Sequence, residues 1–440
     1  MAPVEGESDP TVVAVIGSVF PIPPEAGTPR PFQLLKRIAA RTSVHCLGVV
    51  PQTPEEWERF REHPSLREMF ASTTAFYRRT QVPLIAKLAT LLSGRPLFDQ
   101  RFRDPAVLRA AQARSRALVR AHAPVVFYCW ERDTLQYVPR DLWRNTVWDL
   151  VDAPVLATER RLAIDETLTP WERVKLRTAL IPLRRFERRA LRRVGCAVLN
   201  SSADIAILRA RMPEVAISNV IDGGDAEYFS AEHVSDRSEA AADLLFFGNL
   251  AFPPNADAAL HLVRDVMPLV WRARPDARAI IVGPEPPETL RALQEGRRVL
   301  VTGFVPDVRP HLARATVIVS PLRFGTGMKN KLQAGLAMGK AMVASRVTCE
   351  GFDRLEPGVH ALVADGAEDV ARAALALLAD PERRRALGAA GRELIRTHYS
   401  WDAAADALWE NLRHLGTATG TTDGSSSEER RSTYARTDSA

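Results

Sequence analysis

Cysteine is scarce in this sequence and is nowhere closely paired. Four cysteines occur in 440 residues, and no two of them form a CxxC pair. Three of them, Cys46, Cys129 and Cys196, lie in short apolar runs typical of buried strands, where a free thiol behaves as a small hydrophobic side chain. This distribution argues against structural zinc and favours a reducing compartment, so we expect a cytoplasmic protein.

Long apolar runs are also missing. No uninterrupted stretch is long enough to cross a bilayer, and the acidic, polar residues 1–10 do not have the composition of a secretory signal. Hydrophobic residues make up 46% of the chain and charged residues 25%, a balance typical of soluble globular proteins. Neither half has a GxGxxG motif after its first predicted strand, which disfavours a dinucleotide-dependent oxidoreductase.

Positive charge is modest in total but unevenly distributed. The net charge is +6, and six arginines fall within one predicted helical stretch: Arg184, Arg185, Arg188, Arg189, Arg192 and Arg193. A solvated helix face is the simplest interpretation. The alternative is a surface that attracts anionic lipid or a phosphorylated acceptor, which would put the protein at the inner face of the membrane. A nucleic-acid partner is not expected, because no aromatic residues are interleaved with these arginines.

Short apolar runs alternate with longer amphipathic runs through most of the chain. The predicted strands are residues 11–17, 43–50, 125–129, 146–151, 195–200, 243–248, 278–283, 298–302, 316–321, 341–345 and 361–364. Helical patterns separate nearly all of them, for example residues 31–40, 107–121, 256–273, 329–338 and 367–378. Continuous buried strands that alternate with helices predict an α/β fold with parallel sheets covered on both faces.

The alternation is interrupted at residues 221–224, where we place the boundary between two domains. The predicted organisation is a disordered segment at 1–10, a Rossmann-like domain at 11–222, a second at 223–400 and a last helix at 401–415. The tail at 416–440 is rich in Gly, Thr, Ser and charge, and we expect disorder because it cannot bury enough surface to offset the entropy of ordering.

The most informative stretch for chemistry is residues 317–345. A predicted strand ends near Pro321, a loop with Gly325 and Gly327 follows, and a helix begins close to Lys329 and Lys331. Ligands of open parallel sheets bind beyond the carboxyl ends of the strands, and glycines there let the backbone approach a phosphate. Lysines in the first turn of a helix are unfavourable unless an anion lies beside them. A diphosphate site and a tight turn with two solvated lysines are equally compatible with this spacing.

Several segments together resemble a known family. They are "FFGNLAFPPNADAAL", "PDARAIIVGPEPP", "VLVTGFVPDVRPHLARATVIVSPLRFGTGMKNK", "LAMGKAMVAS", "CEGFDRLEPGVHALVAD" and "RTHYSW". In this order they are similar to the nucleotide-sugar-binding half of retaining glycosyltransferases of family 4 (group 1), especially those associated with bacterial exosortase and exopolysaccharide systems. In the first half, "FPIPPEAGTPRPFQLLKRIA" and "NVIDGGDAEYF" resemble the same group more weakly. The resemblance implies a GT-B architecture, with two Rossmann-like domains facing across a cleft and a C-terminal helix that crosses back to the first.

The resemblance also implies roles for individual residues. The donor-binding residues would be Gly27, Gly248, Asn249, Phe304, Val305, Arg323, Gly325, Thr326, Gly327 and Glu350. Lys329 and Lys331 would be the catalytic pair that neutralises the leaving phosphates. The polar residues after "PVVFYC", Glu131 and Asp133, are candidates for acceptor binding, and an ordinary polar loop is the alternative interpretation. Neither a metal nor a cofactor is expected, since the nucleotide sugar is a substrate.

The sequence departs from the family pattern at three places. The family usually carries two glutamates separated by seven residues, and Thr326 and Ala334 stand at those positions. The second glutamate usually holds the donor ribose, which the methyl group of Ala334 cannot do. The loop "GNLAFPPN" lacks the arginine and lysine of many relatives, and no histidine follows "PVVFYC".

The leading hypothesis is a glycosyltransferase that moves a sugar from a nucleotide-sugar donor to a glycan, lipid-linked or natural-product acceptor with retention. The alternative, motivated by Ala334, is a non-catalytic relative that binds a sugar nucleotide or activates a partner. A nucleotide-sugar 2-epimerase is disfavoured, because the acidic and histidine groups that it would need around the sugar are not found.

Overall fold

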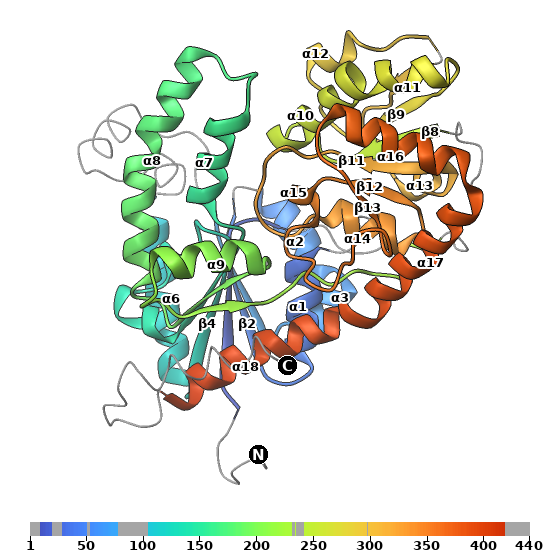
Figure 1. Ribbon diagram of the computed structural model, residues 1–440. Coiled ribbons are helices and arrows are strands. Elements are labelled where there is room, and N and C mark those ends of the chain that lie inside the picture. Colours follow the sequence, from blue (N-terminus) through green and yellow to red (C-terminus); the bar gives the residue numbers. More distant parts are fainter. Residues whose placement is uncertain are drawn as a thin grey trace. The chain divides into compact units, whose positions relative to one another are not determined.

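The computed structural model describes residues 9–19, 29–50, 53–77, 104–230, 234, 242–296 and 298–418 (Figure 1). The chain divides into two compact units. The first comprises Met1–Thr158, Pro170–Val220 and Ala404–Ala440, and the second comprises Glu159–Thr169 and Ile221–Ala403. Gly27 and the tail from residue 419 lie outside the described residues.

The first unit contains a seven-stranded sheet in the order β3-β2-β1-β4-β5-β6-β7. All neighbouring strands in it are parallel. The strands are β1 (Thr11–Ile16), β2 (Val44–Val50), β3 (Ser72–Tyr77), β4 (Val125–Trp130), β5 (Thr146–Val151), β6 (Cys196–Leu199) and β7 (Ile217–Asn219). Most are short runs rich in valine and other apolar residues, and both faces are buried, as expected for a parallel sheet.

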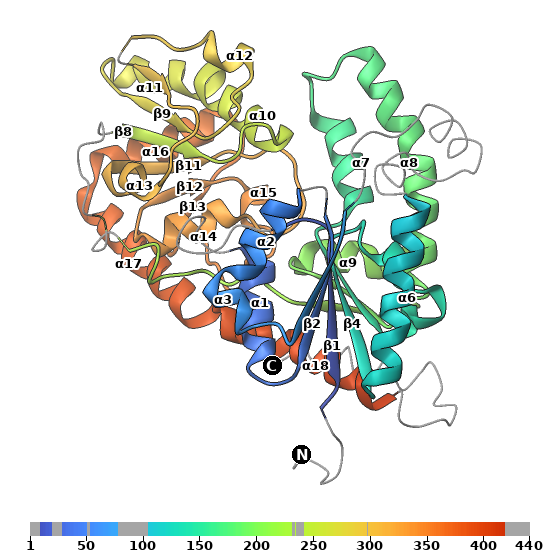
Figure 2. The same cartoon turned by 180° about the vertical axis from the view of Figure 1, so that it is seen from behind.

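Helices cover both faces of this sheet. They are α1 (Arg30–Ala39), α2 (Pro54–Glu62), α3 (Pro64–Arg67), α6 (Pro105–Ala121), α7 (Pro154–Ile164), α8 (Pro170–Leu191) and α9 (Ser202–Arg211), with 3₁₀ turns at Leu135–Tyr137 and Arg140–Asn145. Figure 2 shows α1 on one side of the strands and α6 and α9 on the other. The start of α6 illustrates the local signals, since the Asp104 carboxylate accepts a hydrogen bond from the Ala106 N–H at 2.9 Å ahead of Pro105 in the first turn.

The second unit contains a six-stranded parallel sheet in the order β10-β9-β8-β11-β12-β13. The strands are β8 (Ala242–Phe247), β9 (Ala279–Val282), β10 (Val299–Val301), β11 (Ala315–Ser320), β12 (Met342–Ala344) and β13 (Leu362–Val363). In chain order this is the 3-2-1-4-5-6 arrangement of the doubly wound fold, and the first unit has the same order with one added strand.

Two apolar clusters form the core on the two faces of the second sheet. One includes residues of α10 (Pro253–His261), the π-helical turn Leu262–Val266, α11 (Met267–Ala273) and α16 (Ala367–Ala379). The other includes residues of α13 (Arg309–Arg314), α14 (Asn330–Ala337) and α17 (Pro381–His398). The short helices α12 (Glu288–Arg291) and α15 (Arg346–Cys349) complete the unit.

The last helix, α18 (Trp401–Ala418), starts at the predicted position and runs past the predicted end at residue 415. From Ala404 onward it belongs to the first unit, where the Asn411 amide donates to the Ser218 hydroxyl at 3.1 Å. Packing on that unit explains why residues of low helix propensity, Gly416 and Thr417, are still helical. At the other end, the Pro10 carbonyl accepts a hydrogen bond from Thr42, so the predicted disordered segment 1–10 extends too far.

Among the described residues, no helix combines the length and the apolar composition needed to cross a membrane.

Candidate functional site

The candidate site of the second unit lies where β8 and β11 run side by side at the centre of the sheet. After β8 the chain proceeds to β9 on one side, and after β11 it proceeds to β12 on the other. The loops beyond the carboxyl ends of these strands therefore diverge, which is where ligands bind in doubly wound sheets. Gly248 and Asn249 follow β8, and residues 321–329 follow β11.

Two lysines lie together at the start of α14. Lys329 is the N-cap residue, its side chain is only 7% exposed, and its ammonium donates to the Gly327 carbonyl at 2.5 Å. The Lys331 ammonium donates to Asn255 Oδ1 at 2.7 Å and lies 5.7 Å from the centroid of the Phe246 ring. Burial, and then the nearby charge of Lys329, lower the pKa of Lys331 to about 7. Two neighbouring ammonium groups at the positive end of a helix are favourable only when an anion joins them.

Asn255, which the sequence analysis did not identify, connects the two loops. Its amide nitrogen donates to the Asn249 carbonyl at 2.8 Å, while its amide oxygen accepts from Lys331. A Cβ atom on Gly248 would lie 3.0 Å from that amide nitrogen, so the glycine permits this close packing. A buried asparagine in the first turn of α10, among apolar residues, was the available signal.

Glycines shape the edge of the sheet around these lysines. Gly327 has φ +69°, a conformation that favours glycine, and Gly325 has φ +149°. Gly283, at the end of β9, has φ +155°, and a Cβ atom there would lie 1.9 Å from the Gly248 carbonyl oxygen. Thr326, between Gly325 and Gly327, is partly exposed. The backbone at the ends of β8 and β9 is therefore packed too closely for a side chain at position 283, while the loop after β11 has backbone conformations that favour glycine.

Arg323 is placed in this region but its charge is already paired. Its guanidinium binds the carboxylate of Asp257 on α10 through two hydrogen bonds of 2.9 and 2.5 Å. Asp257 is almost fully buried, and its hydrogen bonds raise the pKa of Arg323. The pair ties the loop after β11 to α10, so Arg323 acts in this structure as a support of the loop.

Glu350 is also paired within the second unit. It accepts hydrogen bonds of 2.6 and 3.3 Å from the guanidinium of Arg160, which also donates to the Gly325 carbonyl at 2.5 Å. Glu350 therefore lies beside the glycine loop, and its carboxylate binds an arginine of the protein, while its predicted role in donor binding stays a prediction. Arg160 was missed because 190 residues separate it from Glu350 in the chain.

Phe304 and Val305 follow β10 on the same edge of the sheet as Gly248. The Phe304 ring is 74% exposed, while Val305 packs partly against the core. The preceding residue, Gly303, has φ +72°, and its carbonyl accepts from the Gly283 N–H at 3.1 Å. An exposed aromatic ring on a fixed backbone offers a surface for stacking a planar ring.

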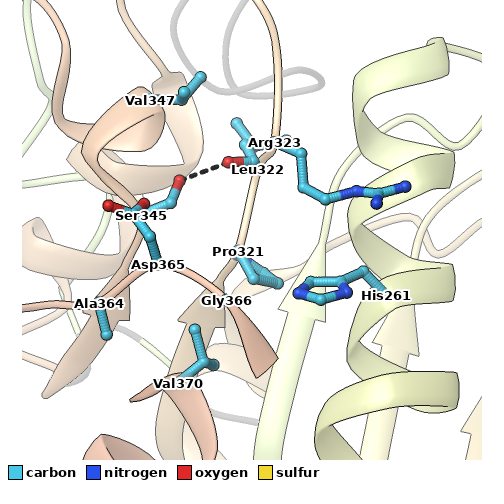
Figure 3. A pocket seen from close by; sticks show the side chains of 10 residues that line it. All are labelled: His261, Pro321, Leu322, Arg323, Ser345, Val347, Ala364, Asp365, Gly366 and Val370. Carbon is cyan, nitrogen blue, oxygen red and sulfur yellow. Dashed lines mark hydrogen bonds between the residues drawn. The ribbon is translucent and has the colours of Figure 1, made fainter. Parts of the chain in front are cut away.

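A cavity of about 210 Å³ adjoins the loop after β11 (Figure 3). It is lined by His261, Pro321, Leu322, Arg323, Ser345, Val347, Ala364, Asp365, Gly366 and Val370. Figure 3 shows His261 and Arg323 on one side of it and Ser345 on the other, with the Ser345 hydroxyl donating to the Leu322 carbonyl at 2.6 Å. The Nδ1 atom of His261 lies 2.6 Å from the Oδ2 atom of Asp265, within hydrogen-bond distance. His261, Arg323 and Ser345 all bind other protein groups, so the lining of the cavity does not indicate a particular ligand.

In the first unit, Glu131 and Asp133 follow β4, which lies beside β1 at the centre of that sheet. Glu131 is exposed and has φ +70°, which is rare for a residue with a side chain. Its N–H donates to the Asp149 carbonyl at 2.8 Å, and its carbonyl accepts from Trp148 at 3.3 Å. Such strained positions are often found at functional sites. Asp133 is paired with Arg132 at 3.0 Å.

A buried network near this position was not anticipated. The Asp149 carboxylate, fully buried, accepts from the Arg30 guanidinium at 3.0 Å and from the Tyr128 hydroxyl at 2.6 Å. Arg30 begins α1, so the network fixes the start of that helix against β4 and β5. The predicted donor contact Gly27 precedes it, outside the described residues. Among the described residues, no group of three His, Cys, Asp or Glu side chains is arranged to hold a metal ion.

Comparison with protein families finds one match, which covers part of the second unit. Residues 241–380 match the family model described as Glycosyl transferases group 1. This stretch contains β8, the glycine loop, both lysines of α14 and Asp257. No curated protein matches the chain.

Solved structures resemble nearly the whole chain. Sucrose-phosphate synthase from Thermosynechococcus elongatus is similar with 16% identity and a TM-score of 0.61, over 93% of this chain and 100% of that one. Anabaena HepE, solved with UDP and glucose, has 14% identity and a TM-score of 0.60, over 91% and 98%. A UDP-forming α,α-trehalose-phosphate synthase from Burkholderia vietnamiensis has 13% identity and a TM-score of 0.60, over 92% and 99%. The chain thus has the α/β fold of GT-B glycosyltransferases, which confirms the predicted fold class.

Proposed function

We propose that this protein is a glycosyltransferase that takes a sugar from a nucleotide-sugar donor held by the second unit. The observation that carries the proposal is the pair Lys329 and Lys331 beside the glycine loop. The match to group 1 glycosyl transferases covers this same stretch. UDP and glucose, found in the Anabaena structure, are ligands of the kind expected here.

The proposed donor site uses the described residues as follows. The diphosphate lies at the start of α14, where Lys329 and Lys331 neutralise it and the backbone of Gly325 and Gly327 approaches it. The base stacks near Phe304, and the loop at Gly248 and Asn249 closes the other side. Thr326 and Glu350 remain candidates for contacts with the sugar, Glu350 through its position beside Gly325 and Arg160.

We further propose transfer with retention, as in family 4 enzymes. In this route the bond from the anomeric carbon to the leaving phosphate breaks while a bond to the acceptor oxygen forms on the same face. The acceptor proton moves to the leaving phosphate oxygen. The protein then has to stabilise the diphosphate and orient the acceptor. The lysines supply the positive charge that other enzymes take from a divalent metal, so no metal or other cofactor is proposed.

The acceptor belongs to the first unit in this proposal. Glu131, strained and exposed beside the centre of the sheet, is the first candidate for a hydrogen bond to an acceptor hydroxyl, and Asp133 is the second. We propose a glycan, lipid-linked or natural-product acceptor, in a cytoplasmic exopolysaccharide or exosortase-associated system at the periphery of the membrane.

A second candidate function is a non-catalytic subunit that binds a sugar nucleotide or activates a partner. Ala334 favours it, because its methyl group is buried and the neighbouring Gln333 amide already donates to the Asp222 carbonyl at 2.5 Å. The carboxylate that could substitute, Glu350, is paired with Arg160.

Calorimetry with UDP-, GDP-, ADP- and dTDP-sugars, followed by transfer assays with the donor that binds, tests both candidates. We expect one donor family to bind and Lys331→Met and Lys329→Met to reduce binding at least about tenfold each, the loss expected for a charge-assisted phosphate contact. Lys36→Met, an exposed lysine of α1, is the matched control. Donor binding without any transfer favours the non-catalytic subunit, and equal binding by all three variants refutes the proposed phosphate site.

A further inference from the structure

One face of α8 combines large exposed apolar side chains with the first unit's densest run of arginines. The exposed fractions are 74% for Trp171, 49% for Val174 and 54% for Ile181. Their spacing of three and seven residues puts them on one stripe of the helix. Figure 1 shows α8 as the long green helix whose N-terminal end extends beyond the strands of the first sheet.

The opposite face of α8 is fixed to the core. Leu180, Leu183, Ala190 and Leu191 are buried, and the buried Glu187 carboxylate accepts from the Val155 N–H at the start of α7. The helix therefore cannot rotate to hide its apolar stripe without losing these contacts. The packing of α8 on the first unit therefore keeps Trp171, Val174 and Ile181 exposed.

Positive charge surrounds the apolar stripe. Lys175 and Arg177 lie on its two sides along the helix, and Arg185, Arg188 and Arg189 follow towards the C-terminal end, all exposed. The helix has seven basic and two acidic residues, and one of the acidic ones is the buried Glu187. These five basic side chains form no ion pair with any residue in the described part of the chain. Arg188 contributes to the charge around the Glu214 carboxylate, and the charges of Lys175, Arg177, Arg185 and Arg189 face solvent.

The combination argues against the simpler interpretations. Contact with solvent alone does not explain a tryptophan that is about three quarters exposed. Binding of a small phosphorylated acceptor would not require an apolar stripe. Helices that lie flat in a membrane interface need both, with tryptophan and aliphatic side chains in the acyl boundary and arginines at the lipid phosphates. About 25 Å of helix separates Trp171 from Arg188, so the apolar and the basic side chains occupy successive parts of the exposed side of α8.

We propose that this α8 face docks the protein on the surface of a membrane that contains anionic lipid. The face is defined by Trp171, Val174, Lys175, Arg177, Ile181, Arg185, Arg188 and Arg189. Apolar insertion supplies part of the binding free energy, and the arginines make it depend on anionic headgroups and on salt. The inference specifies the surface for the membrane-peripheral position named in the proposed function, and it is independent of the sugar transfer because it uses neither the donor site nor the acceptor site.

Flotation of the full chain with vesicles tests the proposal without any activity measurement. The vesicles are phosphatidylcholine alone, or equal parts of phosphatidylcholine and phosphatidylglycerol. We expect binding to the anionic vesicles, weakened by added NaCl, and little binding to the neutral ones. Arg185→Gln/Arg188→Gln should lower the partition coefficient about 25-fold, at roughly fivefold for each arginine. Trp171→Ser/Ile181→Ser should lower it about tenfold through lost apolar insertion.

The control variants remove arginines or an apolar side chain from the second unit, away from α8. Arg372→Gln/Arg385→Gln removes two exposed arginines from the second unit, and Val359→Ser removes an exposed apolar side chain from it. Both controls should bind anionic vesicles as the unchanged protein does. The proposal is overturned if the unchanged protein binds neither kind of vesicle or both equally, or if the α8 and control variants behave alike, since the face would then serve another partner or none.

Discussion

At the scale of single residues, Lys331 is the most informative side chain. Its ammonium is held by a neutral amide, and burial together with the charge of Lys329 keeps its pKa near 7. A diphosphate beside it would favour the charged form and raise that pKa again. Ligand binding and protonation of Lys331 are therefore coupled in the proposed site.

We predict that binding of a nucleoside diphosphate such as UDP takes up a proton above pH 7. Below pH 7 Lys331 is charged with or without ligand, and above it the free protein loses a proton that the complex keeps, so affinity falls by up to about tenfold per pH unit. Calorimetry at pH 8 in two buffers of different ionisation enthalpy measures the uptake. Lys331→Met should abolish it and Lys36→Met should not. Absence of uptake in the unchanged protein would contradict the coupling.

Gly283 offers a prediction about stability. Because a Cβ atom would lie 1.9 Å from the Gly248 carbonyl oxygen, Gly283→Ala must push β8 and β9 apart at their ends. We expect a loss of about 2–4 kcal/mol in the free energy of unfolding, measured by denaturant titration. Gly358→Ala is the control, because Gly358 also has a positive φ but open space around it, and it should cost only about 1 kcal/mol. Equal losses of stability in the two variants would mean that the positive φ at each glycine, and not the close contact at Gly283, determines the loss.

At the scale of elements, the ion pair of Arg323 and Asp257 connects the loop after β11 to α10. The family resemblance implies that Arg323 binds the donor, whereas its guanidinium has a buried protein partner in the structure. A direct contact with the donor and a support of the loop predict different losses of donor binding when Arg323 or Asp257 is replaced.

A double-mutant cycle distinguishes these roles. If Arg323 supports the loop, Arg323→Met and Asp257→Asn should weaken donor binding to a similar extent, and the double variant should lose less than the sum, with a coupling free energy of about 1–3 kcal/mol. Calorimetry with the bound donor measures each corner of the cycle. Additive effects, with a much larger loss for Arg323→Met, would instead indicate a direct contact between Arg323 and the donor.

The same scale shows which elements the sequence could predict. Long apolar runs such as β1, β8 and β11 were predicted within a residue or two, since burial on both faces leaves a clear pattern. Two strands were missed. β3, "STTAFY", is a half-buried edge strand that begins with three serine and threonine residues, and β7, "ISN", is too short to show any period. Both owe their structure to a neighbouring strand in the sheet.

At the scale of the whole molecule, the succession of strands and helices along the chain could be predicted from the sequence. Contacts between residues far apart in the sequence could not. The glycine loop and the two lysines are contiguous in sequence, so their pattern could be recognised. Asn255 reaches Lys331 across 76 positions, and Arg160 reaches Glu350 across 190. No local pattern contains such partners, because they depend on how the strands are ordered in the sheet. The doubly wound order of both sheets likewise became visible only in three dimensions.

The division of the chain into units has a practical consequence for dissecting the protein. The second unit includes Glu159–Thr169, which lies far upstream of the rest of it, and α18 returns to the first unit from Ala404. A fragment cut at the apparent boundary, residues 221–403, would lack the Arg160 guanidinium that holds both Glu350 and the Gly325 carbonyl. Chimeras that exchange one half for that of a relative would lose the same clamp. If the proposed donor site is correct, donor specificity is best transplanted together with the 159–169 segment, so that Arg160 accompanies Glu350 and the glycine loop.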